Sequence, residues 1–284
     1  MAKMGLALSG GGIKGATHIG VLKALEENNI KIDYISGTSS GSIVACLYAC
    51  GYSTDEIYDL FKKYCKIIVS YNINTILSSI RYFILKRKVP FGFINGEKIE
   101  HIINKACNAK GIYNINQVKM PLAIQSVNAI DGTLVTFVSQ IPRAYVDVKN
   151  EYINDIVIGK AVRASSSYPV LFNTCKFLDY DLIDGGVRDN NPIEVLYDIG
   201  ADKTIVSCFE SREDNNAPDD LFEVVFRCID IMGFEISTEK LKKADYILRT
   251  QINNTKLLDI SKLDTCYELG YESAINQIKM MKLK

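Results

Sequence analysis

The sequence has very little histidine, no tryptophan, no excess of charge of either sign and no long apolar run. His18 and His101 are the two histidines among 284 residues, so few sites can depend on an imidazole. Lys plus Arg and Asp plus Glu each number 33, and this balance argues against the basic surface with which proteins bind nucleic acid. The most apolar stretch, residues 67–85, is interrupted by Asn, Ser and Arg and predicts no membrane-spanning helix.

The cysteines do not follow a ligand pattern. Eight are present, none forms a Cys-x-x-Cys pair, and their spacing is irregular. A zinc site and a disulfide framework are therefore not expected, and no metal or other cofactor is predicted. We expect buried thiols that pack as small apolar side chains in a reducing compartment. The N-terminal residues show no signal-peptide pattern, which favours a cytoplasmic protein.

The composition and the order of elements predict an α/β fold. With 48% hydrophobic and 23% charged residues, the chain is not a disordered one. Strands at residues 5–8 and 32–36 alternate with helices near 19–27 and 42–50, which predicts a mainly parallel sheet between helices. Residues 121–130 and 133–138 flank Asp131-Gly132, a strong hairpin signal. Residues 177–183 predict another strand. Since no linker or repeat is visible, residues 1–284 are expected to form one domain.

A glycine-rich loop follows the first strand. Gly10-Gly11-Gly12-Ile13-Lys14-Gly15 exposes backbone N–H groups just before a helix, where an anionic oxygen can bind. The dinucleotide interpretation requires an acidic residue at the end of the second strand, which ends in Ser36-Gly37 instead. The P-loop interpretation requires a lysine after the last glycine, where Ala16 stands. Both nucleotide-binding interpretations are therefore weak.

The second specialised segment is Gly37-Thr38-Ser39-Ser40-Gly41. It is a G-x-S-x-G sequence between a predicted strand and a predicted helix, the context of a nucleophile elbow. Glycines on either side of Ser39 relieve crowding in a strained turn that presents the hydroxyl at the head of the helix. Beside such a serine, the glycine loop is predicted to be an oxyanion hole.

A serine nucleophile needs a base, and the order of the residues limits the choice. No histidine follows His101, so a triad in the order Ser, Asp or Glu, His is impossible. His18 and His101 are better explained as packing or surface residues of helices. The base must then be a carboxylate or a lysine. Asp184, followed by Gly185 and Gly186 at the end of a predicted strand, supplies a carboxylate, which we expect to be largely buried and within hydrogen-bonding reach of Ser39.

Together these segments resemble the patatin-like phospholipase family. The resemblance rests on the glycine loop, the Ser39 turn, the Asp184-Gly185-Gly186 segment and the block at residues 164–169, and it covers about residues 4–200. It implies a three-layer α/β/α fold and a Ser–Asp dyad. By position, Ser39 would be the nucleophile, Asp184 the base, and Gly10, Gly11 and Gly12 the oxyanion loop. Supporting positions would be Lys14, Gly37, Gly41, Gly185 and Gly186.

Two residues depart from the family pattern, and the last 80 residues carry none of its motifs. Lys14 stands where arginine is commoner. Tyr168 stands where the family more often has a small residue, which could narrow the mouth of the pocket.

The one strongly polarised part of the chain lies at about residues 60–96. Its basic residues, from Lys62 to Lys88, are interleaved with aliphatic and aromatic residues. The segment contains no acidic residue. One interpretation is an amphipathic insertion that makes peripheral contact with a membrane through residues 62–88. The other is an ordinary helical insertion that packs on the domain, with solvated charges. The sequence favours neither.

The sequence therefore predicts a hydrolase of acyl lipids, of the phospholipase A or lysophospholipase type, that acts through an acyl-enzyme. An acyltransferase on the same fold and a catalytically silent lipid-binding module are the alternatives. The partner would be an acyl lipid or phospholipid. The transferase ranks lower because acyl-carrier transferases usually have a histidine beside the serine, where Thr38 stands here.

Overall fold

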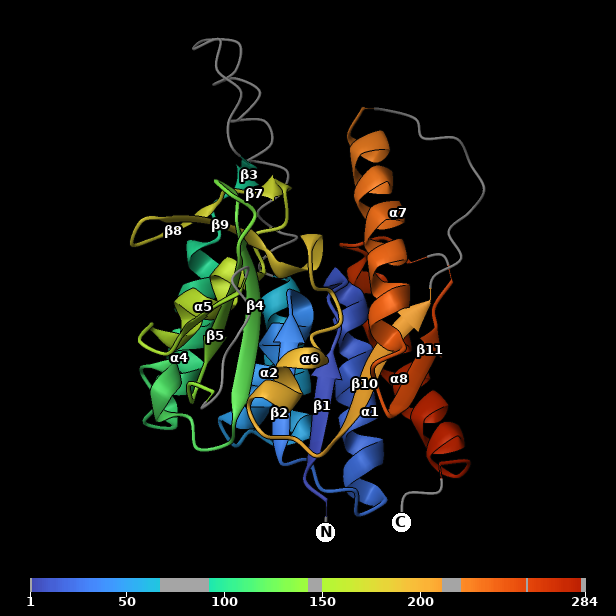
Figure 1. Ribbon diagram of the computed structural model, residues 1–284. Coiled ribbons are helices and arrows are strands. Elements are labelled where there is room, and N and C mark those ends of the chain that lie inside the picture. Colours follow the sequence, from blue (N-terminus) through green and yellow to red (C-terminus); the bar gives the residue numbers. More distant parts are fainter. Residues whose placement is uncertain (1, 67–91, 143–149, 211–220, 254, 282–284) are drawn as a thin grey trace.

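The structure, a computed structural model, describes residues 2–66, 92–142, 150–210, 221–253 and 255–281. Most of the described strands form one sheet, whose main path runs in the order β11-β10-β1-β2-β4-β5-β6 (Figure 1). The strands on this path are β1 (Met4–Leu8), β2 (Tyr34–Thr38), β4 (Leu122–Asn128), β5 (Leu134–Val138), β6 (Asn150–Ile153), β10 (Lys203–Glu210) and β11 (Tyr246–Gln251). The neighbours from β11 to β4 are parallel, so the predicted mainly parallel sheet is confirmed.

Antiparallel pairing begins at β4, which pairs in this way with both β5 and β9. The predicted hairpin around Asp131-Gly132 is confirmed as the antiparallel pair β4 and β5. The predicted strand over residues 177–183 is instead a hairpin of β8 (Cys175–Phe177) and β9 (Tyr180–Asp184). Leu178 takes a positive φ of 49° in the turn between them, a conformation that its sequence did not signal. A separate small sheet pairs β3 (Gly92–Ile94) with β7 (Val170–Phe172).

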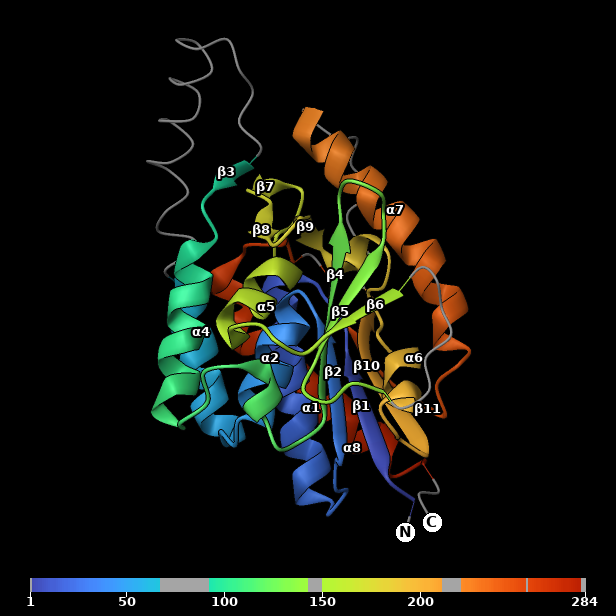
Figure 2. The ribbon, with the colours of Figure 1, turned by 60° about the vertical axis from the view of Figure 1, so that its left-hand side comes forward.

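Helices cover both faces of the main sheet, as predicted, but unequally (Figure 2). One face carries the larger apolar core, to which α1 (Ala16–Glu27), α2 (Ser40–Ala49), α4 (Glu97–Ala109), α5 (Ile158–Ser165) and α8 (Leu263–Ile278) contribute. The other face carries a smaller cluster formed with α6 (Glu194–Asp198), against which Leu241 of α7 (Leu221–Leu241) packs. The result is a three-layer α/β/α arrangement with one thick and one thin helical layer.

The edge of β4 that faces β2 brings two distant segments together. β2 runs parallel to β4 and ends with Thr38 paired to Gln125. From the next residue of β4, Ser126, the same edge is occupied by β9, which runs antiparallel and begins its pairing with Asp184. The two strands thus meet end to end along one neighbour. This arrangement places Ser39, just after β2, beside Asp184 at the end of β9.

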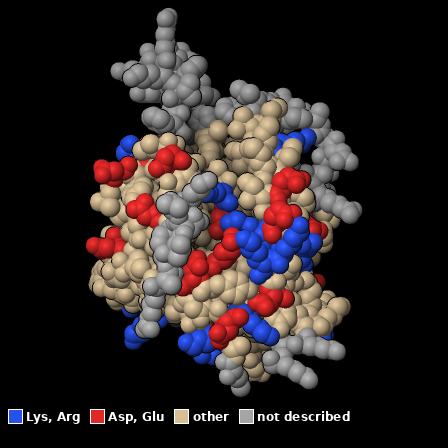
Figure 3. Space-filling view, in the orientation of Figure 1, with Lys and Arg blue, Asp and Glu red and all other residues tan. Residues whose placement is uncertain are grey.

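The predicted insertion is only partly within the described residues. Residues 54–66 are helical, and Lys62 of this helix forms an ion pair with Asp264 of α8, with 2.8 Å between Nζ and Oδ1. Residues 67–91, which hold most of the predicted membrane-contact segment, lie outside the described residues. Of the described helices, none combines the length and the apolar composition that a bilayer span requires. Basic and acidic side chains lie interspersed on the face seen in Figure 3.

Candidate active site

Ser39 occupies a strained turn between β2 and α2. Its backbone has φ 52° and ψ −124°, and its N–H donates to Ser165 Oγ at 2.9 Å. A residue other than glycine rarely adopts a positive φ, and such strain is characteristic of nucleophile elbows. The flanking glycines allow the close approach of backbone that the turn requires. A Cβ on Gly41 would lie 2.4 Å from the carbonyl oxygen of Leu8, and one on Gly37 would lie 2.5 Å from the carbonyl oxygen of Gly41.

Asp184 ends β9 and is only 1% exposed. Its Oδ1 accepts the N–H of Gly186 at 2.8 Å, and its N–H donates to the carbonyl oxygen of Ser167 at 3.0 Å. Its other oxygen, Oδ2, is buried and accepts no hydrogen bond. A buried carboxyl with one oxygen free of partners is available for a proton from a neighbour.

Burial raises the pKa of Asp184 from 3.8 to about 7. The Ser39 hydroxyl and the Gly186 N–H lower the pKa of Asp184 and so offset part of the rise that burial causes. The Ser39 hydroxyl therefore lies near the carboxyl, but no hydrogen bond of standard distance and angle joins the two side chains. The expected burial of Asp184 is confirmed. We also expected Asp184 within hydrogen-bonding reach of Ser39, and its Oδ2 accepts no hydrogen bond from that hydroxyl.

The glycine loop lies against the Ser39 turn. A Cβ on Gly10 would lie 2.9 Å from the Cβ of Ser39, so the loop approaches the serine as closely as backbone can. The Gly10 N–H donates to Asn190 Oδ1 at 3.0 Å, and the Gly11 N–H donates to Ser40 Oγ at 3.1 Å. The Gly12 N–H donates to no group of the described residues. Two of the three predicted oxyanion donors are therefore already engaged within the protein.

The sequence profile described as patatin-like phospholipase matches residues 6–197. The chain belongs to the patatin-like phospholipase family. The predicted resemblance is thus confirmed, and its coverage agrees with the expected residues 4–200.

Individual relatives are similar to this chain over most of its length. The chain is 36% identical over 220 residues to uncharacterized protein R571 of Acanthamoeba polyphaga mimivirus, covering 74% of this chain and 67% of that protein. It is 29% identical over 295 residues to lysophospholipase NTE1 of Lodderomyces elongisporus, covering 94% of this chain and 18% of that protein. The chain therefore spans about a fifth of the length of the lysophospholipases that it matches.

Two solved structures share the fold of this family member. VipD from Legionella pneumophila aligns with a TM-score of 0.52 and 15% identity, over 98% of this chain and 67% of that one. ExoU in its complex with SpcU from Pseudomonas aeruginosa aligns with a TM-score of 0.53 and 18% identity, over 98% of this chain and 51% of that one. At this identity, the likeness supports the fold alone.

The block at residues 164–169 accepts hydrogen bonds from the backbone of both members of the predicted dyad, a role that the sequence did not reveal. Ser165 receives the N–H of Ser39, and Ser167 receives the N–H of Asp184. Asn190 is a second such residue. Besides accepting from Gly10, its Nδ2 donates to the Gly10 carbonyl oxygen at 3.4 Å, so it ties the glycine loop to the segment after Asp184. The signal that the sequence offered for residues 164–169 was a run of serines, which carries no charge and no helical or strand periodicity.

The remaining predicted site residues take supporting places. The Nζ of Lys14 lies 5.8 Å from the centre of the Phe209 ring. A Cβ on Gly185 would lie 2.4 Å from the carbonyl oxygen of Gln125, so only glycine lets this segment approach β4. Tyr168 contacts the ring of Phe226 on α7, with the ring centres 5.8 Å apart.

Neither histidine takes part in the site. His18 is fully buried, and its ring nitrogens lie 2.8 Å from Ser207 Oγ and 2.8 Å from the carbonyl oxygen of Ser9. Burial lowers the pKa of His18 to about 4, so the ring is neutral and is held on both sides. His101 is exposed on α4. The predicted packing and surface roles are confirmed.

Residues beyond the family match also shape the site. A Cβ on Gly11 would lie 2.0 Å from the Phe209 ring, and one on Gly12 would lie 2.3 Å from the carbonyl oxygen of Leu257. Lys240 of α7 forms an ion pair with the buried carboxylate of Asp189, with 2.7 Å between Nζ and Oδ1. The C-terminal part thus supports both the glycine loop and the segment that follows Asp184.

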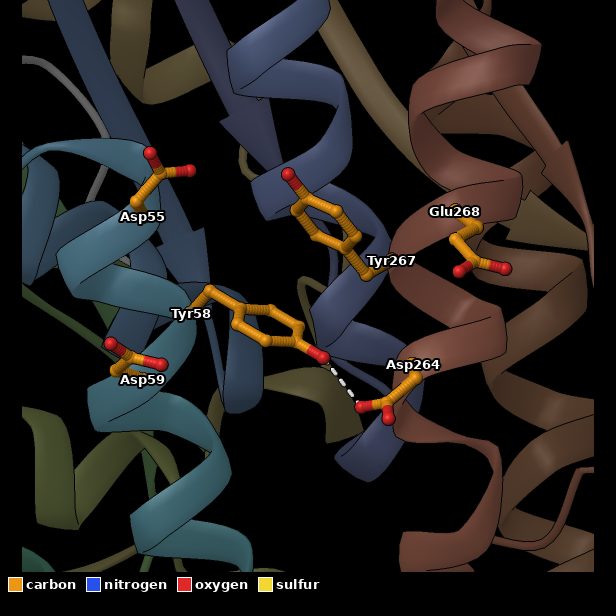
Figure 4. A pocket seen from close by; sticks show the side chains of 6 residues that line it. All are labelled: Asp55, Tyr58, Asp59, Asp264, Tyr267 and Glu268. Atoms are coloured by element: carbon orange, nitrogen blue, oxygen red, sulfur yellow. Dashed lines mark hydrogen bonds between the residues drawn. The ribbon is translucent and has the colours of Figure 1, made fainter.

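A hollow of about 430 Å³ lies on another part of the molecule, between the helical residues 54–66 and α8 (Figure 4). Its lining consists of acidic and tyrosine side chains: Asp55, Tyr58, Asp59, Asp264, Tyr267 and Glu268. The Tyr58 hydroxyl donates to Asp264 at 2.5 Å. None of the predicted site residues lines this hollow, so it does not belong to the candidate active site.

Proposed function

We propose that this chain hydrolyses carboxylic esters of acyl lipids with a Ser39–Asp184 dyad, by way of an acyl-enzyme. The observation that carries the proposal is the end-to-end meeting of β2 and β9 on β4, which sets the strained serine beside a buried aspartate. Membership of the patatin-like phospholipase family supports a lipid ester as substrate. The lysophospholipase relatives favour phospholipids with one acyl chain.

In the first step, Ser39 Oγ attacks the ester carbonyl carbon while its proton passes to the Asp184 carboxylate. A pKa of about 7 makes this carboxylate a far better base at neutral pH than an exposed aspartate. The tetrahedral intermediate collapses, the alcohol leaves with the proton from Asp184, and Ser39 remains acylated. Water then attacks the acyl carbonyl carbon while Asp184 accepts its proton, and the second intermediate collapses as that proton passes to Ser39 Oγ and the fatty acid leaves.

The negative oxygen of the intermediate is proposed to bind to the glycine loop. Gly12 offers an N–H without a protein acceptor among the described residues. The Gly11 N–H is held by a neutral hydroxyl, and an oxyanion is a stronger acceptor that can replace it. Gly10 is bound to Asn190 through both its N–H and its carbonyl oxygen. We therefore assign the donors to Gly11 and Gly12, and an anchoring role to Gly10.

Contact with the lipid surface stays a prediction from sequence. Lys62, at the start of the basic segment, is engaged by Asp264. Binding to anionic vesicles at low salt, compared between the protein and a variant in which Lys86, Arg87 and Lys88 are neutralised, tests this contact.

Covalent labelling with a fluorophosphonate tests the proposed nucleophile. We expect labelling at Ser39, its loss in Ser39→Ala, and strong slowing in Asp184→Asn, because the serine then has no base. Ser53→Ala, which removes a hydroxyl at the start of the helical residues 54–66, should label like the unaltered protein. Labelling that persists in Ser39→Ala would contradict the assignment, and folded protein without any labelling would favour a silent lipid-binding module. Release of free fatty acid with and without an alcohol acceptor separates hydrolysis from acyl transfer.

A further inference from the structure

A group of three cysteines lies in the larger core, away from the dyad. Cys46 belongs to α2, Cys50 immediately follows that helix, and Cys107 lies in the last turn of α4. Their exposed fractions are 0%, 6% and 0%, respectively. The Sγ atom of Cys107 lies 3.7 Å from that of Cys46 and 3.6 Å from that of Cys50, and all three sulfurs lie within 4.8 Å of one another.

These separations match the geometry of metal-bound thiolates. A zinc–sulfur bond of about 2.3 Å in a tetrahedral site places neighbouring sulfurs about 3.8 Å apart. A disulfide requires about 2.05 Å between two sulfurs and would leave the third unpaired. The Cys107 sulfur is nearly equidistant from the other two sulfurs. The group therefore resembles one face of a tetrahedral metal site more than a disulfide with a third, unbonded cysteine beside it.

We infer that Cys46, Cys50 and Cys107 form a binding site for one thiophilic metal ion, with Zn²⁺ as the expected occupant and water as the fourth ligand. Cys50 is the most exposed of the three, so the water ligand is proposed to reach the ion on its side. Binding converts three thiols into thiolates and releases their three protons to solvent, with no change in oxidation state. The ends of α2 and α4 meet here, and the partial negative charge at helix C-termini favours a cation.

The site would be structural. Cys46 lies about 10 Å along α2 from the turn that carries Ser39, so the ion cannot touch a bound ester. By joining α2 to α4, it would fix the far end of the helix that follows the nucleophile. This inference departs from the sequence-based expectation, because Cys46 and Cys50 lie four residues apart at the end of α2 and Cys107 lies 57 residues after Cys50. A search for Cys-x-x-Cys pairs does not find such a set.

Metal titration of the reduced protein tests the site. After removal of metal with a chelator, Cd²⁺ serves as the probe, because thiolate-to-cadmium charge transfer absorbs in the ultraviolet. We expect the absorption to saturate at one equivalent of Cd²⁺, and Zn²⁺ to compete for the same site. Elemental analysis of protein purified without chelator should find about one zinc per chain. No saturable absorption by the fully reduced, folded protein would overturn the inference.

Cysteine variants show which sulfurs bind the ion. Cys107→Ser should weaken Cd²⁺ binding by at least about a hundredfold, since a direct ligand matters more than the outer partners whose loss costs 10- to 100-fold. Cys175→Ser removes another buried thiol outside the group and should bind as the unaltered protein does. Unchanged binding in Cys107→Ser would refute the site. If that variant fails to fold, the stoichiometry of the unaltered protein and Cys50→Ser decide. Since metal binding is read without substrate, neither result bears on the proposed hydrolase activity.

Discussion

Asp184→Asn is expected to abolish catalysis and to make the fold more stable at neutral and alkaline pH. In the folded protein the pKa of Asp184 is about 7, against 3.8 for the ordinary group, because the side chain is buried. Between these two values the folded state holds a proton that the unfolded chain has lost. The unaltered protein therefore loses free energy of unfolding as the pH rises, and the loss is complete above the folded-state pKa.

The size of the effect follows from the shift. A difference of about three pKa units corresponds to about 4 kcal/mol of unfolding free energy. Asparagine has nearly the same shape, keeps an oxygen for the Gly186 N–H, and does not ionise. Asp184→Asn should therefore exceed the unaltered protein by up to about 4 kcal/mol at about pH 8, and the difference should nearly vanish at about pH 4. Asp189, whose pKa burial also raises, to about 6, is present in both proteins and cancels.

Urea unfolding followed by circular dichroism, at several pH values across this range, measures the difference. Asp181→Asn is a matched control on the same strand. The pKa of Asp181 is lowered by Thr174 and Lys176, so this carboxylate stabilises the fold at neutral pH and that stability is lost as the pH falls. Its variant should show the opposite sign. If Asp184→Asn is less stable than the unaltered protein at alkaline pH, or if the difference does not change with pH, the account of Asp184 as a destabilised base is wrong.

Three further predictions concern the same region. First, kcat/KM for a soluble ester should rise with pH through an apparent pKa near that of Asp184, about 7, because the base must be deprotonated; a flat profile between about pH 5 and pH 9 would contradict this. Second, Asn190→Ala should lower kcat more than it raises KM, because the glycine loop loses its anchor while the lipid contacts stay; stopped-flow and steady-state kinetics separate the two. Third, Lys240→Met should destabilise the fold by about 3 kcal/mol, because the buried Asp189 carboxylate loses its cation and keeps, among the described residues, only the hydrogen bond from Gln125. Lys242→Met, which removes an exposed ion pair, should change the stability by less than about 1 kcal/mol, and equal effects of both variants in urea would refute the role of the buried pair.

The sequence by itself determined the local devices of the site. Ser39 needs flanking glycines because its turn brings backbone within contact distance, and that requirement is visible as G-x-S-x-G without any structure. The positions of the two histidines likewise excluded a Ser–Asp–His triad in that order, because neither of them follows Asp184 in the chain. The alternation of strands and helices predicted a mainly parallel sheet, and Asp131-Gly132 predicted the antiparallel hairpin of β4 and β5, because both signals are properties of short segments.

Tertiary structure alone decided which of these segments meet and which protonation and hydrogen-bonding state their side chains have. Ser39 and Asp184 are 145 residues apart in the chain, yet β2 and β9 share one edge of β4, and no local pattern encodes which strand fills an edge. The raised pKa of Asp184 depends on the many side chains that exclude water around it. The engagement of Gly10 by Asn190, and the approach of Cys107 to Cys46 and Cys50, are likewise products of packing. Sequence periodicity reports which face of an element is buried, but only the folded chain determines what that face touches.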